Sequence, residues 1–108
     1  MQRYLLIESR DSFGRERGGF CVELARALVA RGDTTTVLLV QNGVLAARSG
    51  AQAKALAALA AEGVPVLADA FSLAERGIDP SRLVDGISST PLDTVIDRMS
   101  EGWKVLWH

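Results

Sequence analysis

Runs of apolar and β-branched residues recur along this chain, each bounded by charged or turn-forming residues. These runs lack helical periodicity, and such runs are typical of strands buried on both faces of a sheet. They predict strands at residues 3–8, 35–40, 64–68, 84–88 and 103–107, of which 84–88 has the weakest pattern.

Between these runs the apolar residues recur at the spacing of amphipathic helices. Residues 19–32 place Cys21 on a helical apolar stripe, and residues 52–62 form an alanine- and leucine-rich helix. Asp69 and Asp79 each stand where an aspartate can cap a short helical segment.

The last helix has the most complete set of signals. Thr90 is placed to cap it, Pro91 suits its first turn, and Gly102 ends it. The spacing predicts a stripe that faces the core, made of Leu92, Val95, Ile96 and Met99.

Strands that alternate with helices predict right-handed crossovers and a mainly parallel sheet with helices on both faces. The length of 108 residues fits a single domain over residues 1–108. In such sheets ligands bind beyond the carboxyl ends of the strands. We therefore expect the segments after Glu8, Val40 and Ala68 to meet at one rim.

Three loops at this rim supply the candidate ligand-binding residues. The first loop, 9–19, combines glycines with arginines, which can bind a phosphate or carboxylate group. Its acidic residues can instead neutralise those arginines, and we prefer the interpretation that this segment is a solvated loop rather than an anion site. The predicted binding residues of all three loops are Arg10, Asp11, Arg15, Asn42, Gly43, Asp69 and Ser72.

Cys21 is the only thiol in the sequence and the sole candidate for nucleophilic catalysis. A position near a helix N-terminus can lower the pKa of a thiol. The apolar stripe around Cys21 instead favours a role in packing. His108, the only histidine, is expected to lie away from the first helix, so the sequence predicts neither a Cys–His pair nor a metal site.

Composition and charge narrow the classes of partner. The formal net charge of -1 provides no field that would attract nucleic acid or an anionic membrane. One cysteine precludes an internal disulfide, which is typical of a reducing compartment. We expect a cytoplasmic protein without a cofactor, and Trp103 and Trp107 are candidates for a subunit contact.

Four stretches together resemble the DsrE/DsrF-like superfamily, small proteins related to sulfur-relay subunits of bacterial tRNA thiolation and sulfur oxidation. The stretches are YLLIESRD, TTVLLVQNGVLAAR, GVPVLADAFSLAERGI and PLDTVIDRMSEGWKVLWH, and they span almost the whole chain. The resemblance implies a DsrE-like three-layer α/β/α sandwich on a mainly parallel five-stranded sheet. It also implies assembly into homo-oligomers or DsrE-like hetero-oligomers.

Sulfur-carrying members of that superfamily place a cysteine just after the third strand, ahead of an arginine-glycine pair. Here residues 68–73, ahead of Arg76-Gly77, contain no cysteine, and Asp69 and Ser72 occupy the approximate positions. Neither a carboxylate nor a hydroxyl can carry sulfane sulfur. We therefore expect a non-catalytic, oligomeric binding or partner protein. The alternatives are a persulfide carrier or transferase that uses Cys21, and a protein that binds a small anion or nucleotide at the rim.

Overall fold

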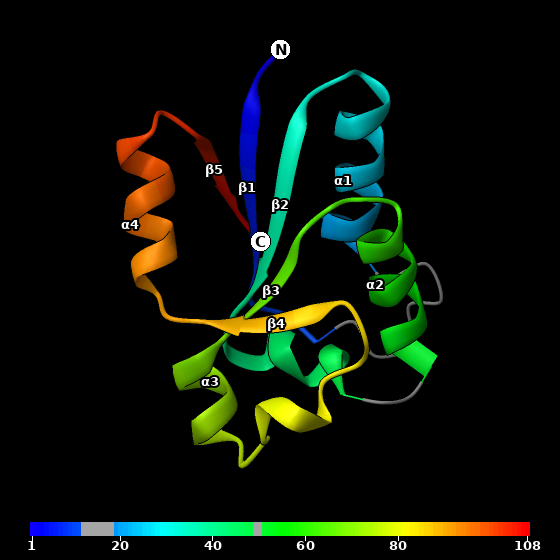
Figure 1. The fold of residues 1–108 in the computed structure, drawn as a ribbon, viewed down its shortest axis with the longest axis vertical. Helices are drawn as coiled ribbons and strands as arrows, with labels where there is room; N and C mark the ends of the chain where they lie inside the picture. The colour runs from blue at the N-terminus through cyan, green and yellow to red at the C-terminus, as the bar shows by residue number, and fades with distance from the viewer. Residues whose placement is uncertain (12–18, 49–50) are drawn as a thin grey trace.

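The computed structural model describes residues 1–11, 19–48 and 51–108. Five parallel strands form one sheet in the order β4-β3-β2-β1-β5, which confirms the predicted α/β architecture (Figure 1). The strands are β1 (Arg3–Glu8), β2 (Thr34–Leu39), β3 (Val66–Asp69), β4 (Ile87–Thr90) and β5 (Lys104–Trp107).

Helices cover both faces of the sheet. On one face lie α1 (Phe20–Ala30) and α2 (Ala51–Ala61), and on the other lies α4 (Asp93–Ser100), as Figure 1 shows. The short helix α3 (Ala70–Glu75) follows β3 directly. Two 3-10 segments complete the chain, η1 (Gln41–Ala47) after β2 and η2 (Pro80–Arg82) before β4.

The sheet separates two apolar clusters because successive side chains of a strand point to opposite faces. In β1, Leu6 belongs to the larger cluster beneath α1 and α2, whereas Leu5 and Ile7 belong to the smaller one. Val95 of α4 packs against the smaller cluster together with Trp103. Alternation within continuous apolar strands therefore builds both layers of core.

The prediction that the last helix buries its apolar stripe is wrong. Every residue of α4 is exposed or half-buried, and Leu92, Ile96 and Met99 face solvent. The helix turns Val95 and Arg98 toward the protein instead, and the Arg98 guanidinium carbon lies 4.9 Å from the centroid of the Trp103 ring. Arg98, stacked on the Trp103 ring, thus faces the protein where the apolar pattern predicts an aliphatic side chain.

The predicted boundaries around the fourth strand are also wrong. The strand begins at Ile87 rather than residue 84, and Thr90 is its last residue. Thr90 does not cap the helix, because α4 begins only at Asp93. Its hydroxyl lies 2.6 Å from the hydroxyl of Thr94, and Leu92 stands at the N-cap without a side-chain hydrogen bond.

All strand exits lie at the same rim, as the sequence predicts. Glu8 pairs with Leu39, and Leu39 pairs with Ala68, so the ends of β1, β2 and β3 are level. Among the described residues, no helix has the length and apolar character required to cross a membrane.

Candidate functional site

Two groups of polar side chains lie at the carboxyl rim, on either side of β2. We call the first the Asp69 network, made of Gln41, Asn42, Asp69, Ser72 and Arg76. We call the second the Glu8 cluster, made of Glu8, Cys21 and His108. The order of the strands places the first beside the end of β3 and the second beside the end of β1.

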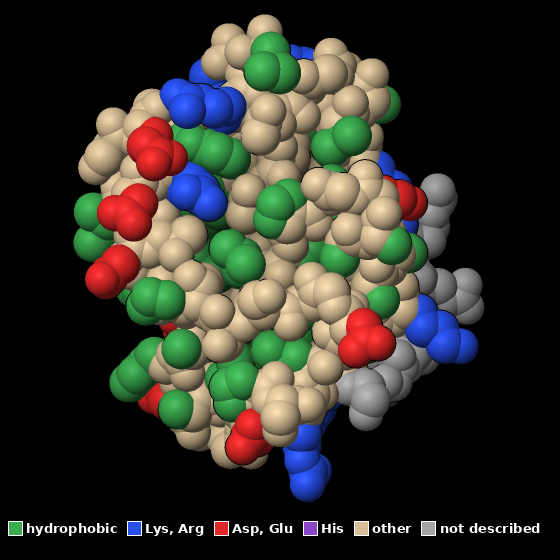
Figure 2. All heavy atoms as spheres, viewed as in Figure 1, with side chains coloured by type: hydrophobic (Ala, Val, Ile, Leu, Met, Phe, Trp, Pro, Cys, Tyr) green, Lys and Arg blue, Asp and Glu red, His purple; other side chains and the backbone are tan. Residues whose placement is uncertain are grey.

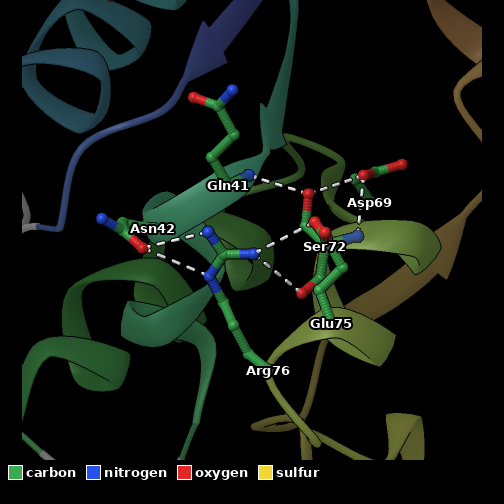
Figure 3. A network of polar contacts seen from close by, with 6 residues as sticks. All are labelled: Gln41, Asn42, Asp69, Ser72, Glu75 and Arg76. Carbon is green, nitrogen blue, oxygen red and sulfur yellow. Dashed lines mark hydrogen bonds and ion pairs between the residues drawn. The ribbon is translucent and has the colours of Figure 1, made fainter.

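The Asp69 network begins as a helix cap. Asp69 ends β3, and its Oδ2 accepts the backbone N–H of Ser72 at 2.9 Å, which confirms the predicted cap of α3. The Ser72 hydroxyl donates to the same oxygen at 2.6 Å and accepts the N–H of Gln41 at 2.8 Å (Figure 3). Ser72 thus connects the start of α3 to the start of η1, and its hydroxyl both donates and accepts a hydrogen bond.

Arg76 closes the network from the end of α3. Its Nε and Nη2 donate to Asn42 Oδ1 at 3.2 and 3.1 Å, and its Nη1 donates to the Ser72 carbonyl at 3.2 Å (Figure 3). Glu75 lies 3.7 Å from the same guanidinium. The Arg76 guanidinium is therefore bound within the chain. The second Asp69 oxygen, Oδ1, is buried without a hydrogen-bond partner among the described residues.

The Glu8 cluster forms because β5 pairs in parallel with β1. His108 follows β5, and its Nδ1 lies 3.0 Å from both carboxylate oxygens of the buried Glu8. The backbone N–H of Arg10 donates to Glu8 Oε2 at 3.2 Å. The Phe20 ring lies against the imidazole with 4.6 Å between ring centroids.

Cys21 completes the cluster from the first turn of α1. Burial raises the pKa of its thiol to about 12, with further contributions from the negative charge of Glu8 and from a hydrogen bond to that carboxylate. The residue is only 3% exposed. Cys21 is therefore a buried, protonated thiol, as its place on the apolar stripe predicts. The expectation that His108 lies away from the first helix is wrong, because the β1–β5 pairing brings it there.

Gly43 connects the two groups through a close backbone contact. A Cβ atom at this position would overlap the backbone oxygen of Glu8 and lie 3.0 Å from its carbonyl carbon. Gly43 and Arg10 also line a cavity of about 10 Å³ beside Glu8 and Cys21. This volume is just enough for one water-sized sphere.

The other predicted binding residues divide between the two groups. Asn42, Asp69 and Ser72 belong to one network, while Arg10 and Gly43 adjoin the Glu8 cluster. Asp11 follows β1 by three residues, and Arg15 lies outside the described residues.

Sequence reasoning missed Glu8, His108 and Arg76. The position of Glu8 as the last polar residue of a buried strand was a usable signal. His108 could have been placed only by knowing that β5 pairs with β1, and Arg76 resembled an ordinary exposed helix charge.

The sequence matches the DsrE/DsrF-like family over residues 2–108. The chain belongs to this family. Two solved structures share its fold with full coverage of both chains. One is the protein of unknown function MTH1491 from Methanobacterium thermoautotrophicum, at 20% identity and a TM-score of 0.85. The other is the ychN protein from E. coli, at 23% identity and a TM-score of 0.84. Comparison with curated proteins gave no match.

Proposed function

We propose that this DsrE-like chain is a non-catalytic, oligomeric partner protein, related to sulfur-relay subunits but not itself a carrier of sulfur. We place it in the cytoplasm because a chain with one cysteine cannot form an internal disulfide, and proteins without disulfides are typical of reducing compartments. The proposal rests on the two side chains at the rim that could act as nucleophiles, Ser72 and Cys21. The hydroxyl after β3 is hydrogen-bonded to Asp69, and the single thiol is buried and protonated.

Association is supported by an exposed apolar stripe on α4. Leu92, Ile96 and Met99 recur at i, i+4 and i+7, so they lie on one side of the helix, and Ile96 is 65% exposed. Trp107 is 63% exposed and pairs with Ile7, which places it on the same face of the sheet as α4. Apolar and aromatic surface of this kind is typical of subunit contacts.

The partner that this surface fits is a second copy of the chain. A stripe along one helix matches itself when two helices pack about a two-fold axis. Acidic side chains form a row over α4 with apolar side chains beside them, in the arrangement of an apolar contact with a polar rim (Figure 2). β5 is also an edge strand, and edge strands can pair with a strand of another chain.

Replacing both Ile96 and Met99 with lysine should convert the oligomer to a monomer at micromolar concentration. Two lysine charges in the middle of the stripe would have to be buried without partners. The free-energy cost of burying them is far larger than the free energy gained from an apolar contact. Light scattering coupled to size-exclusion chromatography measures the mass, and circular dichroism confirms the fold of the variant.

The matched control replaces Asp93 and Asp97 with asparagine. These substitutions make the same change in net charge on the same helix but leave the stripe apolar, so the oligomer should persist. A monomeric native protein, or a lysine variant with native mass, would contradict the oligomeric part of the proposal.

The two other functions that the sequence leaves open have less support. A sulfur carrier that uses Cys21 requires an accessible thiolate, and burial beside Glu8 opposes one. A small anion or nucleotide at the rim requires free donors, but Arg76 and Asn42 bind each other.

A further inference from the structure

We propose that Glu8, Cys21 and His108 bind one divalent transition-metal ion with the ligand preferences of Zn²⁺. The proposal is independent of the oligomeric function above. It rests on the convergence of three ligand types from distant parts of the sequence at the carboxyl end of β1.

The three side chains come from three elements. Glu8 ends β1, Cys21 lies in the first turn of α1, and His108 follows β5. One candidate ligand atom from each lies within 4.8 Å of the others. Donor atoms in a tetrahedral zinc site are about 3.5 Å apart, since zinc bonds to nitrogen and sulfur are about 2.0 and 2.3 Å long. A side-chain adjustment of about 1 Å therefore completes the site.

The backbone holds His108 in place for this role. Its N–H donates to the Ile7 carbonyl at 2.8 Å, and its carbonyl accepts both the N–H and the hydroxyl of Ser9 at 2.9 Å. Phe20 fixes the ring from one side. The imidazole is 32% exposed, so an ion can enter from solvent although Glu8 and Cys21 are buried.

The donor set selects the class of metal. A thiolate, an imidazole nitrogen and a carboxylate oxygen suit Zn²⁺ and similar ions, whereas Mg²⁺ and Ca²⁺ prefer oxygen ligands throughout. Three protein ligands leave a fourth position for water. Arg10 is a cation that lines the neighbouring cavity, but the residue is exposed, and solvent screens its charge.

A bound dication would offset the negative charges of Glu8 and of a Cys21 thiolate, whose ligand atoms lie together in this cluster. When the ion binds, the S–H bond of Cys21 breaks, a metal–sulfur bond forms and the proton passes to solvent. No electron is transferred in this step.

The test titrates metal-free protein, with any purification tag removed, first with Co²⁺ and then with Zn²⁺. We expect one Co²⁺ per chain, a thiolate-to-cobalt charge-transfer absorption and the visible bands of tetrahedral cobalt, all abolished by Zn²⁺. At a Zn²⁺ concentration roughly a hundred times Kd, the melting temperature should rise by about 10 °C.

Two variants separate ligation from nonspecific binding. Cys21→Ala should remove the charge-transfer absorption, and His108→Gln should weaken Co²⁺ binding by more than the roughly 100-fold that loss of an outer-shell partner costs. His108 is partly exposed, so this variant keeps the test usable even if Cys21→Ala unfolds. Glu62→Gln alters a carboxylate that binds Arg26 at the surface and should bind Co²⁺ like the native protein. Absence of the charge-transfer absorption, or native affinity in His108→Gln, would overturn the proposal.

Discussion

Replacing Gly43 with alanine should lower the free energy of unfolding by about 3 kcal/mol, the upper part of the range for overpacked sites. The new methyl group would overlap the backbone oxygen of Glu8. That oxygen cannot simply move away, because it accepts the N–H of Val40 at 2.9 Å. The variant must separate β1 from η1 or lose that hydrogen bond. Urea denaturation followed by circular dichroism measures the change.

Gly63→Ala is the control for this prediction. Gly63 has a φ of +97° but open space where the methyl group would lie. The variant should therefore lose only the free energy of placing alanine in a left-handed backbone conformation, about 1–2 kcal/mol. A Gly43→Ala protein that is as stable as Gly63→Ala would show that the contact between Gly43 and Glu8 is loose.

Cys21 in the native, metal-free protein should react with iodoacetamide at least about 30-fold more slowly at pH 7 than in the denatured chain. A rise in pKa from 9.0 to about 12 lowers the thiolate fraction about a thousandfold. The greater nucleophilicity of a more basic thiolate recovers only about 20- to 30-fold of this loss. Burial then slows the reaction further. Intact-mass spectrometry over time, in the presence of a chelator, follows the labelling.

The pH dependence and two variants test the cause of the slow labelling. The rate should keep rising above pH 9, because the thiolate fraction grows until the pH passes the raised pKa. Glu8→Gln removes a charge that raises the pKa, so labelling should accelerate, though not fully, because burial is the larger cause. Ala70→Cys adds an exposed thiol that should be labelled quickly in the same molecule. Rapid native labelling at Cys21 would refute the buried-thiol account.

The sequence was sufficient for the sheet and for its rim. Parallel strands buried on both faces leave continuous apolar runs, and the run at residues 3–8 has the length of a strand rather than of a helix. Once the strands alternate with helices, the direction of every strand follows, and so does the common rim after Glu8, Val40 and Ala68.

The orientation of α4 could not be predicted from its pattern. Periodicity shows that Leu92, Ile96 and Met99 share one side of the helix, but it does not show whether that side faces the core or a partner. The chain covers the inner side with Val95 and with Arg98 stacked on Trp103. That stacking is a tertiary contact that no local pattern encodes.

The Glu8 cluster was missed for a similar reason. Glu8 and His108 are a hundred residues apart in the sequence, and only the pairing of β5 with β1 makes them neighbours. The Asp69 cap was predicted because all of its parts lie within one helical turn. Local geometry was thus readable from the sequence, whereas contacts that depend on strand order were not.

Loading with sulfane sulfur tests whether this DsrE-like chain carries sulfur. Native, metal-free protein is incubated with a low-molecular-weight persulfide and analysed by intact-mass spectrometry, with Ala70→Cys as the positive control. We predict that the native chain gains no sulfur atom, whereas Ala70→Cys gains one at its new thiol. A native chain that acquires sulfur at Cys21 would contradict the account.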